Sequence, residues 1–383
     1  MMKQVMEFID NNKTLVEAHI ADLHFGVIEP DKQYKILKEQ FLDYLNAMNV
    51  LDIVSVNGDI FEHKFMANSD AVVYALYFMN ALVDICKRKG ATLILISGTG
   101  SHDADQLKLF TPYMRDPNVD VRIVFEAQFL YVKGKKILAI PEMYNRGEEY
   151  YTKYLMNSGS YDACYMHGTF VGAVPGKNDR DLDSNREPVF SMDDFGMCTG
   201  PIISGHVHVH GQYKKDFYYC GSPLRWRFGE EEEKGFIILI HDLSHRQYYV
   251  HFEPIKSFSY VTVYLDNLLD QDPRYIIQYI QNMKDNGIDH IRVRFTKNVL
   301  DKITILKEYY RSRNDIKIET DFEQAKLDKQ LSEMDDRLQQ YDYIFDKNLS
   351  PTEVLVQYIN SQEGNEFWTV DKLEEFLHDI EKL

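Results

Sequence analysis

Short apolar runs alternate with longer amphipathic stretches from Leu15 to about Lys136, and this alternation constrains the fold more than any other feature of the chain. The runs LVEAHI, DIVSV and TLILI have the length and the β-branched content of buried strands. Two stretches with helical periodicity lie between them, and the second extends from about Ser69 to Arg88. The apolar face of the first comprises Tyr34, Leu37, Phe41, Leu42 and Leu45. This order predicts βαβ units and an α/β fold.

Further strand candidates continue to about His251 and extend the first domain over residues 14–253. They are VRIVF, QFLYV, KKILAIPE, DACYMHG, PIISGHVHVHGQY, FYYCGSP and GFIILIHDL. We expect two layers of strands flanked by helices. Residues 254–322 contain FSYVTVYL, IRVRF and IKIET, separated by two helical stretches, and predict a small α+β capping domain. Residues 323–383 predict a helical tail, in which Ser350, Pro351 and Glu353 form a capping box.

The composition excludes several classes of protein. A chain of 383 residues with 44% hydrophobic residues is typical of a globular protein of two or three domains. The net charge of -17 argues against a protein that coats nucleic acid through its overall field. The four cysteines lack Cys-x-x-Cys spacing, so we expect free thiols in a reducing cytoplasm. No apolar run approaches the roughly 18 residues of a membrane span, and the amino terminus does not resemble a signal peptide.

Ionisable side chains directly follow most of the apolar runs. They are Asp22 and His24 in ADLHFG, Asp59 in NGD, His102 and Asp103 in GSHD, His167 in MHGT, and His206 and His208 in SGHVHVHG. Because the carboxyl ends of strands meet at one rim of an α/β sheet, we expect these side chains to cluster. Carboxylates and imidazoles without thiolates favour Mn²⁺, Fe²⁺ or Zn²⁺, whereas carboxylates alone would favour Mg²⁺.

The six candidate ligands indicate two ions. A single ion that also holds water would not take six ligands from the protein. Asp59 is the carboxylate expected to bridge them. Side chains two residues apart point the same way in an extended chain. We therefore expect Asp22 with His24, and His206 with His208, each to bind one ion as a pair.

The ordered set Asp-x-His, Gly-Asp, Gly-x-His-Asp, His-Gly and Gly-His-x-His resembles the calcineurin-like metallophosphoesterase superfamily. Within it, YYCGSPLRWRFGEEEEKGF is similar to the segment after the last metal motif of bacterial and phage SbcD-type nucleases. The resemblance implies a two-layered β-sandwich, two divalent ions with Mn²⁺ preferred, and hydrolysis of DNA phosphodiesters in break repair and recombination. The metal ligands that it implies are Asp22, His24, Asp59, His167, His206 and His208.

The catalytic residue that the resemblance implies is His102, near the leaving oxygen, with Asp103 orienting it. The family has an asparagine ligand at the position of Ser101. The serine side chain is shorter than that of asparagine, and its hydroxyl is a poorer ligand than an amide oxygen. We therefore expect a second metal site that is weaker, filled by water or completed by a partner.

The resemblance further implies a coiled-coil ATPase partner of the SbcC type, in a heterotetramer that contains two copies of this chain. Apolar stripes of the tail are candidates for docking it: Val354, Leu355, Tyr358 and Ile359, then Val370, Leu373, Phe376, Leu377 and Ile380. The candidates for DNA backbone contact are Lys177, Arg180, Arg225 and Arg227.

Other interpretations remain open for several of these features. The basic residues are equally consistent with surface charge, and the tail stripes with packing on the chain's own small domain. His63 and His210 match no ligand position, and Glu230 to Glu233 are typical of a solvated turn. The substrate could instead be a small phosphate ester or cyclic nucleotide, or the chain a scaffold whose site has decayed through the change at Ser101.

Overall fold

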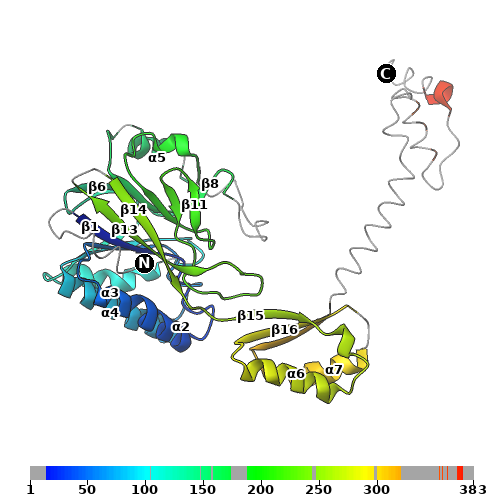
Figure 1. The fold of residues 1–383 in the computed structure, drawn as a ribbon. Coiled ribbons are helices and arrows are strands. Elements are labelled where there is room, and N and C mark those ends of the chain that lie inside the picture. Colours follow the sequence, from blue (N-terminus) through cyan, green and yellow to red (C-terminus); the bar gives the residue numbers. More distant parts are fainter. Residues whose placement is uncertain are drawn as a thin grey trace. The chain divides into compact units, whose positions relative to one another are not determined.

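The computed structural model describes residues 14–103, 105–146, 148–156, 158–173, 188–243, 247–296 and 300–320, together with 353, 356, 360 and 369–373. These residues belong to two compact units. The first ends at Tyr260 and includes Ile288–His290, and the second contains the rest of the chain from Val261. Figure 1 labels their helices and strands.

The first sheet of the larger unit has six strands in the order β14-β13-β1-β2-β3-β4. Strands β1 to β4 are parallel, whereas β13 pairs antiparallel with β1 and β14. Their bounds are β1 (Thr14–Ile20), β2 (Ile53–Asn57), β3 (Thr92–Ile96), β4 (Asp120–Val124), β13 (Lys234–Asp242) and β14 (Gln247–Ile255). The parallel part of this sheet confirms the βαβ alternation expected from the sequence.

The second sheet also has six strands, in the order β11-β12-β10-β7-β6-β5. Its bounds are β5 (Gln128–Val132), β6 (Lys135–Ile140), β7 (Ala163–His167), β10 (Ile202–Gly205), β11 (Gly211–Lys214) and β12 (Phe217–Tyr219). The predicted strand PIISGHVHVHGQY is therefore two strands, β10 and β11. The residues between them, from His206 to His210, form a loop at the carboxyl end of β10.

The side chains of β1 show how the two sheets form layers. Val16, Ala18 and Ile20 belong to the core beneath the helices, whereas Leu15 and Ala21 belong to a separate core that also contains residues of the second sheet. Because β1 is buried on both faces, its apolar residues are not confined to alternate positions, as Leu15 and Val16 show. The mixed α/β class is confirmed.

Helices cover the outer face of the first sheet (Figure 1). They are α2 (Pro30–Leu37), a π-helical turn η1 (Lys38–Leu42), α3 (Asp43–Ala47) and α4 (Asp70–Lys89). The first predicted helix is thus α2, η1 and α3 in succession, and Leu37, Phe41, Leu42 and Leu45 are all buried as expected. Helix α4 begins after Ser69, whose hydroxyl accepts a hydrogen bond from the Val72 N–H, and ends at Gly90 in the left-handed conformation.

The outer face of the second sheet packs against α5 (Glu148–Leu155), the short strands β8 (Thr169–Phe170) and β9 (Val189–Phe190), and the 3-10 turn η4 (Met192–Phe195). A longer 3-10 segment, η2 (Gln106–Arg115), precedes β4. Tyr151, Phe170, Phe190 and Phe195 are buried in this third core. The larger unit therefore has helical segments on the outer faces of both sheets.

A buried charged cluster joins residues of the first sheet to residues of the second. The Glu17 carboxylate lies 2.8 Å from Lys135 Nζ, 3.1 Å from His241 Nε2 and 3.1 Å from His19 Nε2, and the Tyr165 hydroxyl donates to it. Burial raises the pKa of Glu17, but the Lys135 and His241 charges and the hydrogen bonds outweigh burial and hold it well below its ordinary value. Glu17 is therefore a buried anion that depends on its partners.

The described residues of the smaller unit up to Thr320 form a three-stranded sheet in the order β15-β16-β17 with two α-helices, as the alternation in this region predicts. Its elements are β15 (Tyr260–Tyr264), the 3-10 turn η5 (Asp266–Leu268), α6 (Pro273–Asp285), β16 (His290–Phe295), α7 (Leu300–Tyr309) and β17 (Ile316–Thr320). Ile276 and Ile280 of α6 are buried, as are Val293 and Phe295 of β16.

The division into units falls beyond the position that the sequence suggests. Pro254 lies inside β14, where it pairs with Gly235 of β13. A proline is compatible with this place because β14 is an edge strand, so its missing N–H interrupts no ladder between two neighbours. Of the predicted tail stripes, only Val370 and Leu373 are among the described residues, and Leu373 is buried.

Among the helices that the structure describes, none is both long enough and apolar enough to cross a lipid bilayer.

Candidate metal centre

Loops from both sheets meet at the carboxyl ends of β1, β2, β3, β7 and β10. The Asp22 N–H donates to the Gly58 carbonyl (3.0 Å), and the His24 N–H donates to the Asp59 carbonyl (2.9 Å), which fixes the first two loops together. The His206 N–H donates to the Asp22 carboxylate across 184 positions of sequence (2.9 Å). The predicted convergence at one rim is therefore present.

Four predicted ligands have left-handed backbone: Asp22 (φ 52°), His24 (φ 46°), Asp59 (φ 51°) and His206 (φ 87°). Non-glycine residues adopt this conformation at a cost on the order of 1–3 kcal/mol each, and such residues concentrate at functional sites. The extended geometry that we expected for the Asp22-His24 and His206-His208 pairs is wrong, because positive φ ends the strand alternation at these positions.

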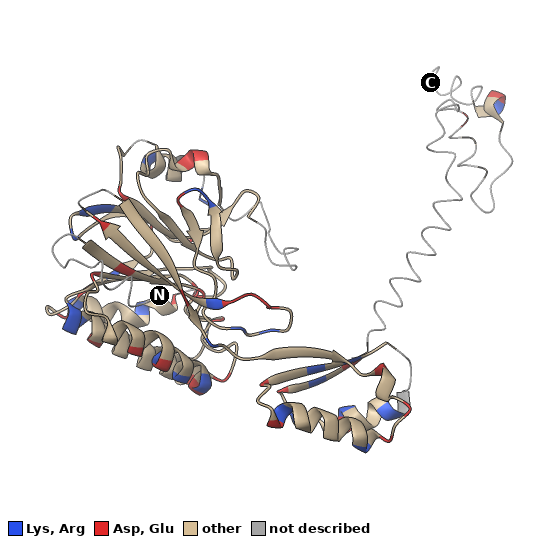
Figure 2. Cartoon of the chain, in the orientation of Figure 1, with Lys and Arg blue, Asp and Glu red and all other residues tan. Residues whose placement is uncertain are grey.

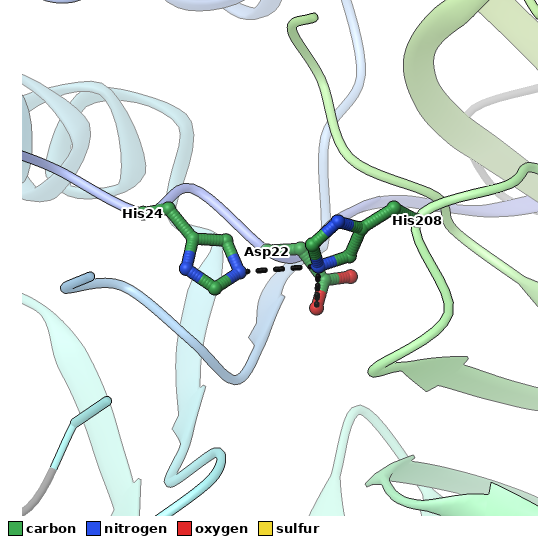
Figure 3. A group of neighbouring side chains, drawn as sticks. All are labelled: Asp22, His24 and His208. Carbon is green, nitrogen blue, oxygen red and sulfur yellow. Dashed lines mark hydrogen bonds and ion pairs between the residues drawn. The ribbon is translucent and has the colours of Figure 1, made fainter. Parts of the chain in front are cut away.

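The first cluster comprises Asp22, His24 and His208 (Figure 3). The Nε2 atoms of His24 and His208 lie 3.2 Å apart, and His208 Nε2 lies 3.9 Å from an Asp22 carboxylate oxygen. The Trp226 ring packs edge-on against both imidazoles, with centroids 5.2 and 5.6 Å away. Two ring nitrogens and a carboxylate thus lie close together, next to the apolar ring of Trp226.

Asp59 joins this cluster to the next one. Its Oδ2 lies 3.8 Å from His24 Nε2 and 3.2 Å from His167 Nε2. The Thr99 N–H and hydroxyl both donate to the carboxylate, at 2.6 and 3.1 Å, which fixes its orientation. Burial raises the pKa of Asp59, but His167, His24 and His102 together outweigh burial and hold the pKa well below its ordinary value. Its position between the two histidines agrees with the bridging role expected for it.

The second cluster comprises His167, His206 and Glu142, a residue that the sequence analysis missed. Glu142 Oε2 lies 2.9 Å from His206 Nδ1 and 3.6 Å from His167 Nε2. His206 and His208 therefore belong to different clusters, which corrects the expectation that they bind one ion together. A glutamate directly after the apolar run ILAIP was the available signal for this residue.

His102 lies beside the first cluster. Its ring packs edge-on against that of His24 at 4.7 Å, and one of its ring nitrogens lies within 4.8 Å of ligand atoms of His24 and Asp59. Its Nδ1 hydrogen bonds to the Glu62 carbonyl, which leaves Nε2 for other contacts. The side chain of Glu62, also missed, lies 2.8 Å from His24 Nδ1. Glu62 thus contacts both histidines.

Asp103 does not contact His102 in the way that we expected. Its carboxylate accepts hydrogen bonds from the backbone N–H groups of Asp59 (3.0 Å), Ile60 (2.8 Å), Phe61 (3.1 Å) and Gly98 (2.9 Å). Burial, together with the Asp59 carboxylate, raises its pKa to about 6. Asp103 therefore fixes the loop that carries Asp59, and the Glu62 carbonyl takes the orienting place next to His102.

Ser101 lies on the same turn but is exposed. Among the described residues, its hydroxyl makes no hydrogen bond to a member of either cluster. A buried carboxylate, Glu142, instead lies beside His167 and His206. The departure from the family pattern at Ser101 thus coincides with an acidic residue from another strand end.

Glycines allow the loops to approach this closely. A Cβ at Gly58, where φ is +88°, would lie 2.1 Å from His167 Nδ1. A Cβ at Gly98 would lie 2.2 Å from an Asp59 carboxylate oxygen. The Gly-Asp and Ser-Gly-Thr-Gly sequences are therefore required for packing as well as for turning.

The charges of the two clusters suit divalent cations. Burial lowers the pKa of His24, His167 and His206, but the neighbouring carboxylates outweigh it and raise all three. One oxygen of Asp22 and one of Glu142 are buried without a hydrogen-bond partner among the described residues. Buried carboxylate oxygens rarely lack a partner. A cation next to each would satisfy these oxygens and replace the histidine protons, so the residues fit a pair of divalent ions.

The predicted DNA contacts are only partly placed. The Arg225 guanidinium donates to the Glu231 and Glu232 carbonyls (3.2 and 2.8 Å), and Arg227 lies 3.4 Å from the Glu230 carboxylate. Figure 2 shows basic and acidic residues together on the loop before β13. Lys177 and Arg180 lie outside the described residues. Arg227, with a side chain 52% exposed, is the more available of the two described arginines.

No family model matches the chain. A protein of Invertebrate iridescent virus 6 named "Putative phosphoesterase 244L" is 24% identical over 248 residues, which are 61% of this chain and 77% of that protein. A solved crystal structure covers 63% of this chain and 99% of its own, with 12% sequence identity and a TM-score of 0.36, which is too low to carry an argument. The name of the viral relative agrees with the class of enzyme expected from the sequence, a hydrolase of phosphate esters.

Proposed function

We propose that this chain is a metal-dependent phosphodiesterase with a calcineurin-like metallophosphoesterase layout, and that its substrate is DNA. One observation carries the proposal. Two clusters of carboxylates and imidazoles, which come from strand ends nearly 190 positions apart in sequence, share Asp59 between them. The viral relative supports phosphoester hydrolysis. The choice of DNA rests on the sequence resemblance to SbcD-type nucleases.

The residues that would hold the first ion are Asp22, His24 and His208, with Asp59 shared. Those that would hold the second are His167 and His206. Divalent ions bound at such residues supply a hydroxide nucleophile at neutral pH and positive charge that neutralises phosphate oxygens. Mn²⁺ suits the mixed imidazole and carboxylate set, and Mg²⁺, Fe²⁺ and Zn²⁺ are the alternatives.

His102 has the position of a general acid. Its Nδ1–H donates to the Glu62 carbonyl, so the protonated ring carries its second proton on Nε2 and can deliver that proton to the oxygen that leaves the phosphate. Its ring lies against that of His24, at the edge of the first cluster, where a phosphate bound to the site would be within reach. Its removal is expected to slow the chemical step and to leave the ion ligands in place.

The partner and the assembly belong to the proposal as well. A chain with a net charge of -17 has little long-range attraction for DNA, so a second protein that holds the duplex would complete the enzyme. We propose an SbcC-type coiled-coil ATPase for this role, docked by the helices that the sequence predicts in the carboxyl-terminal tail, with two copies of each chain. The site of action would then be the cytoplasm, including that of a host cell if a phage encodes the chain.

The full chain, alone and with a candidate ATPase, would be incubated with end-labelled duplex DNA, bis-p-nitrophenyl phosphate and p-nitrophenyl phosphate, with Mn²⁺ and then with EDTA. We expect metal-dependent cleavage of the DNA and of the diester. Turnover of the monoester alone would instead favour the small-ester alternative. Absence of metal-dependent turnover of all three would refute the proposal and favour a scaffold.

A further inference from the structure

The carboxylate of Glu142 is the feature of the site that neither the sequence motifs nor the proposed activity explain. Glu142 follows β6, in the second sheet, and its backbone N–H donates to the Ser97 carbonyl at the end of β3, in the first sheet (3.3 Å). Its side chain is 2% exposed. The backbone bond between the two sheets therefore fixes a buried carboxylate at the rim.

The contacts of Glu142 point to a ligand rather than to a structural acid. Oε2 lies 2.9 Å from His206 Nδ1, 3.6 Å from His167 Nε2 and 3.3 Å from the Thr99 hydroxyl. Oε1 is buried and has no hydrogen-bond partner among the described residues. A structural carboxylate at this depth would have both oxygens paired, as Asp103 does with its four backbone amides.

The neighbours of Glu142 complete the argument. His167 Nε2, which lies 3.6 Å from Oε2, also lies 3.2 Å from Asp59 Oδ2, so one imidazole nitrogen faces both carboxylates. His206 Nδ1 lies 2.9 Å from the same oxygen of Glu142. His167 thus links the Glu142-His206 pair to Asp59, and these two carboxylates and two imidazoles are the kind of donor set that suits Mn²⁺, Fe²⁺ or Zn²⁺.

We propose that Glu142 is a ligand of the second ion, together with Asp59, His167 and His206, and that it replaces the amide missing at Ser101. The inference rests on the proposed two-ion function and adds to it. A carboxylate from the end of β6 takes the role that the family gives to a turn residue. The three carboxylates Asp22, Asp59 and Glu142 then serve two ions, so the second ion is held by charge rather than by an amide dipole.

The test is a count of bound ions. Full-length wild type, Glu142→Ala, Glu142→Gln and Glu126→Ala would be dialysed against Mn²⁺, and the bound metal measured by elemental analysis. Glu126 is a matched control, because it lies just before β5 of the same sheet but has a side chain 67% exposed. We expect two equivalents for wild type and Glu126→Ala, and one for Glu142→Ala. Glu142→Gln keeps an oxygen donor but loses the charge, so we expect its second ion to bind more weakly than in wild type and more tightly than in Glu142→Ala.

The outcomes separate this inference from the proposed function. Two equivalents with unchanged affinity in both Glu142 variants would overturn the role of Glu142 and leave the two-ion enzyme intact. Fewer than two equivalents in wild type would count against the proposed site itself. Anomalous scattering from Mn²⁺-soaked wild-type crystals gives a second readout: a peak at bonding distance from Glu142 supports the inference, and a second peak without Glu142 contact overturns it. Thermal unfolding would verify that each variant is folded. If Glu142→Ala does not fold, the isosteric variant Glu142→Gln carries the test.

Discussion

Removal of the Glu62 carboxylate should selectively weaken the binding of the first ion. It lies 2.8 Å from His24 Nδ1, while the opposite nitrogen of the same ring faces His208 and Asp59. Such a carboxylate fixes the ring orientation and makes the imidazole a stronger ligand. Glu62→Ala removes this contact, but it leaves the backbone carbonyl that holds His102. The variant should therefore separate metal binding from catalysis.

The expected magnitude follows from the exposure of the contact. Loss of a partner of this kind costs about 10–100-fold in metal affinity, or about 1.4–2.7 kcal/mol at 1.36 kcal/mol per tenfold change. The Glu62 side chain is 32% exposed, so water can partly replace it as an acceptor. We therefore expect a loss in the lower half of that range. Glu62→Gln retains an acceptor oxygen and should lose less.

The assay is the Mn²⁺ concentration at half-maximal hydrolysis of a diester, with the Mn²⁺-induced rise in Tm as a readout that needs no turnover. Glu62→Ala should require more Mn²⁺ but recover most of kcat at saturation, whereas Glu126→Ala should behave as wild type. An unchanged Mn²⁺ requirement in Glu62→Ala would refute the orienting role. A loss of kcat that Mn²⁺ does not restore would also refute it, because the carboxylate would then act on the chemical step.

Three further predictions concern catalysis, the buried cluster and loop packing. His102→Ala should reduce kcat about 10²–10⁴-fold, and elemental analysis should show both ions retained. His63→Ala, the matched control, should leave kcat unchanged. Glu17→Leu alone should lower the free energy of unfolding by about 3–5 kcal/mol because Lys135 stays buried, and Glu17→Leu with Lys135→Met should restore most of it in urea titrations. The partners of Glu17 hold its pKa well below 4.5. The contribution of Glu17 to stability is therefore present above pH 4.5 and is lost as the pH falls through the depressed pKa. The double variant should accordingly lose less stability in acid than wild type does. Gly58→Ala should lower Tm and Mn²⁺ binding together, since its Cβ would lie 2.1 Å from His167; an unchanged Tm would contradict the packing argument.

Residues that directly follow an apolar run could be predicted because the rim of a sheet collects them. Asp22, Asp59 and His167 were found in this way, and the structure brings them within reach of one another. Glu142 obeys the same rule, but a single glutamate after Ile-Pro has no partner in its local sequence to distinguish it from a turn residue. Only the fold places it beside His206, 64 positions later in the chain.

Orientation could not be predicted from the sequence, because it depends on backbone angles and distant amides. The His206-His208 spacing suggested one shared ion, yet positive φ at His206 sends the two rings to different clusters. Asp103 appeared next to His102 in sequence, but its carboxylate is taken by amides some 40 positions away. Strand β14 was missed as a whole, because its pairing with β13 and the edge position that accommodates Pro254 depend on the sheet order, which composition does not reveal.

Charge links the acidity of the chain to its proposed chemistry. Without ions, the raised pKa values of His24, His167 and His206 let their protonated rings offset the negative charges of Asp22, Asp59 and Glu142. Two divalent ions bring four positive charges and displace the histidine protons, so the loaded site is positive where a phosphodiester would bind. Affinity for the substrate should then depend on loading of both ions more steeply than in a site with an amide in place of Glu142. A globally acidic chain with such a site would bind phosphate esters only where and when it holds metal.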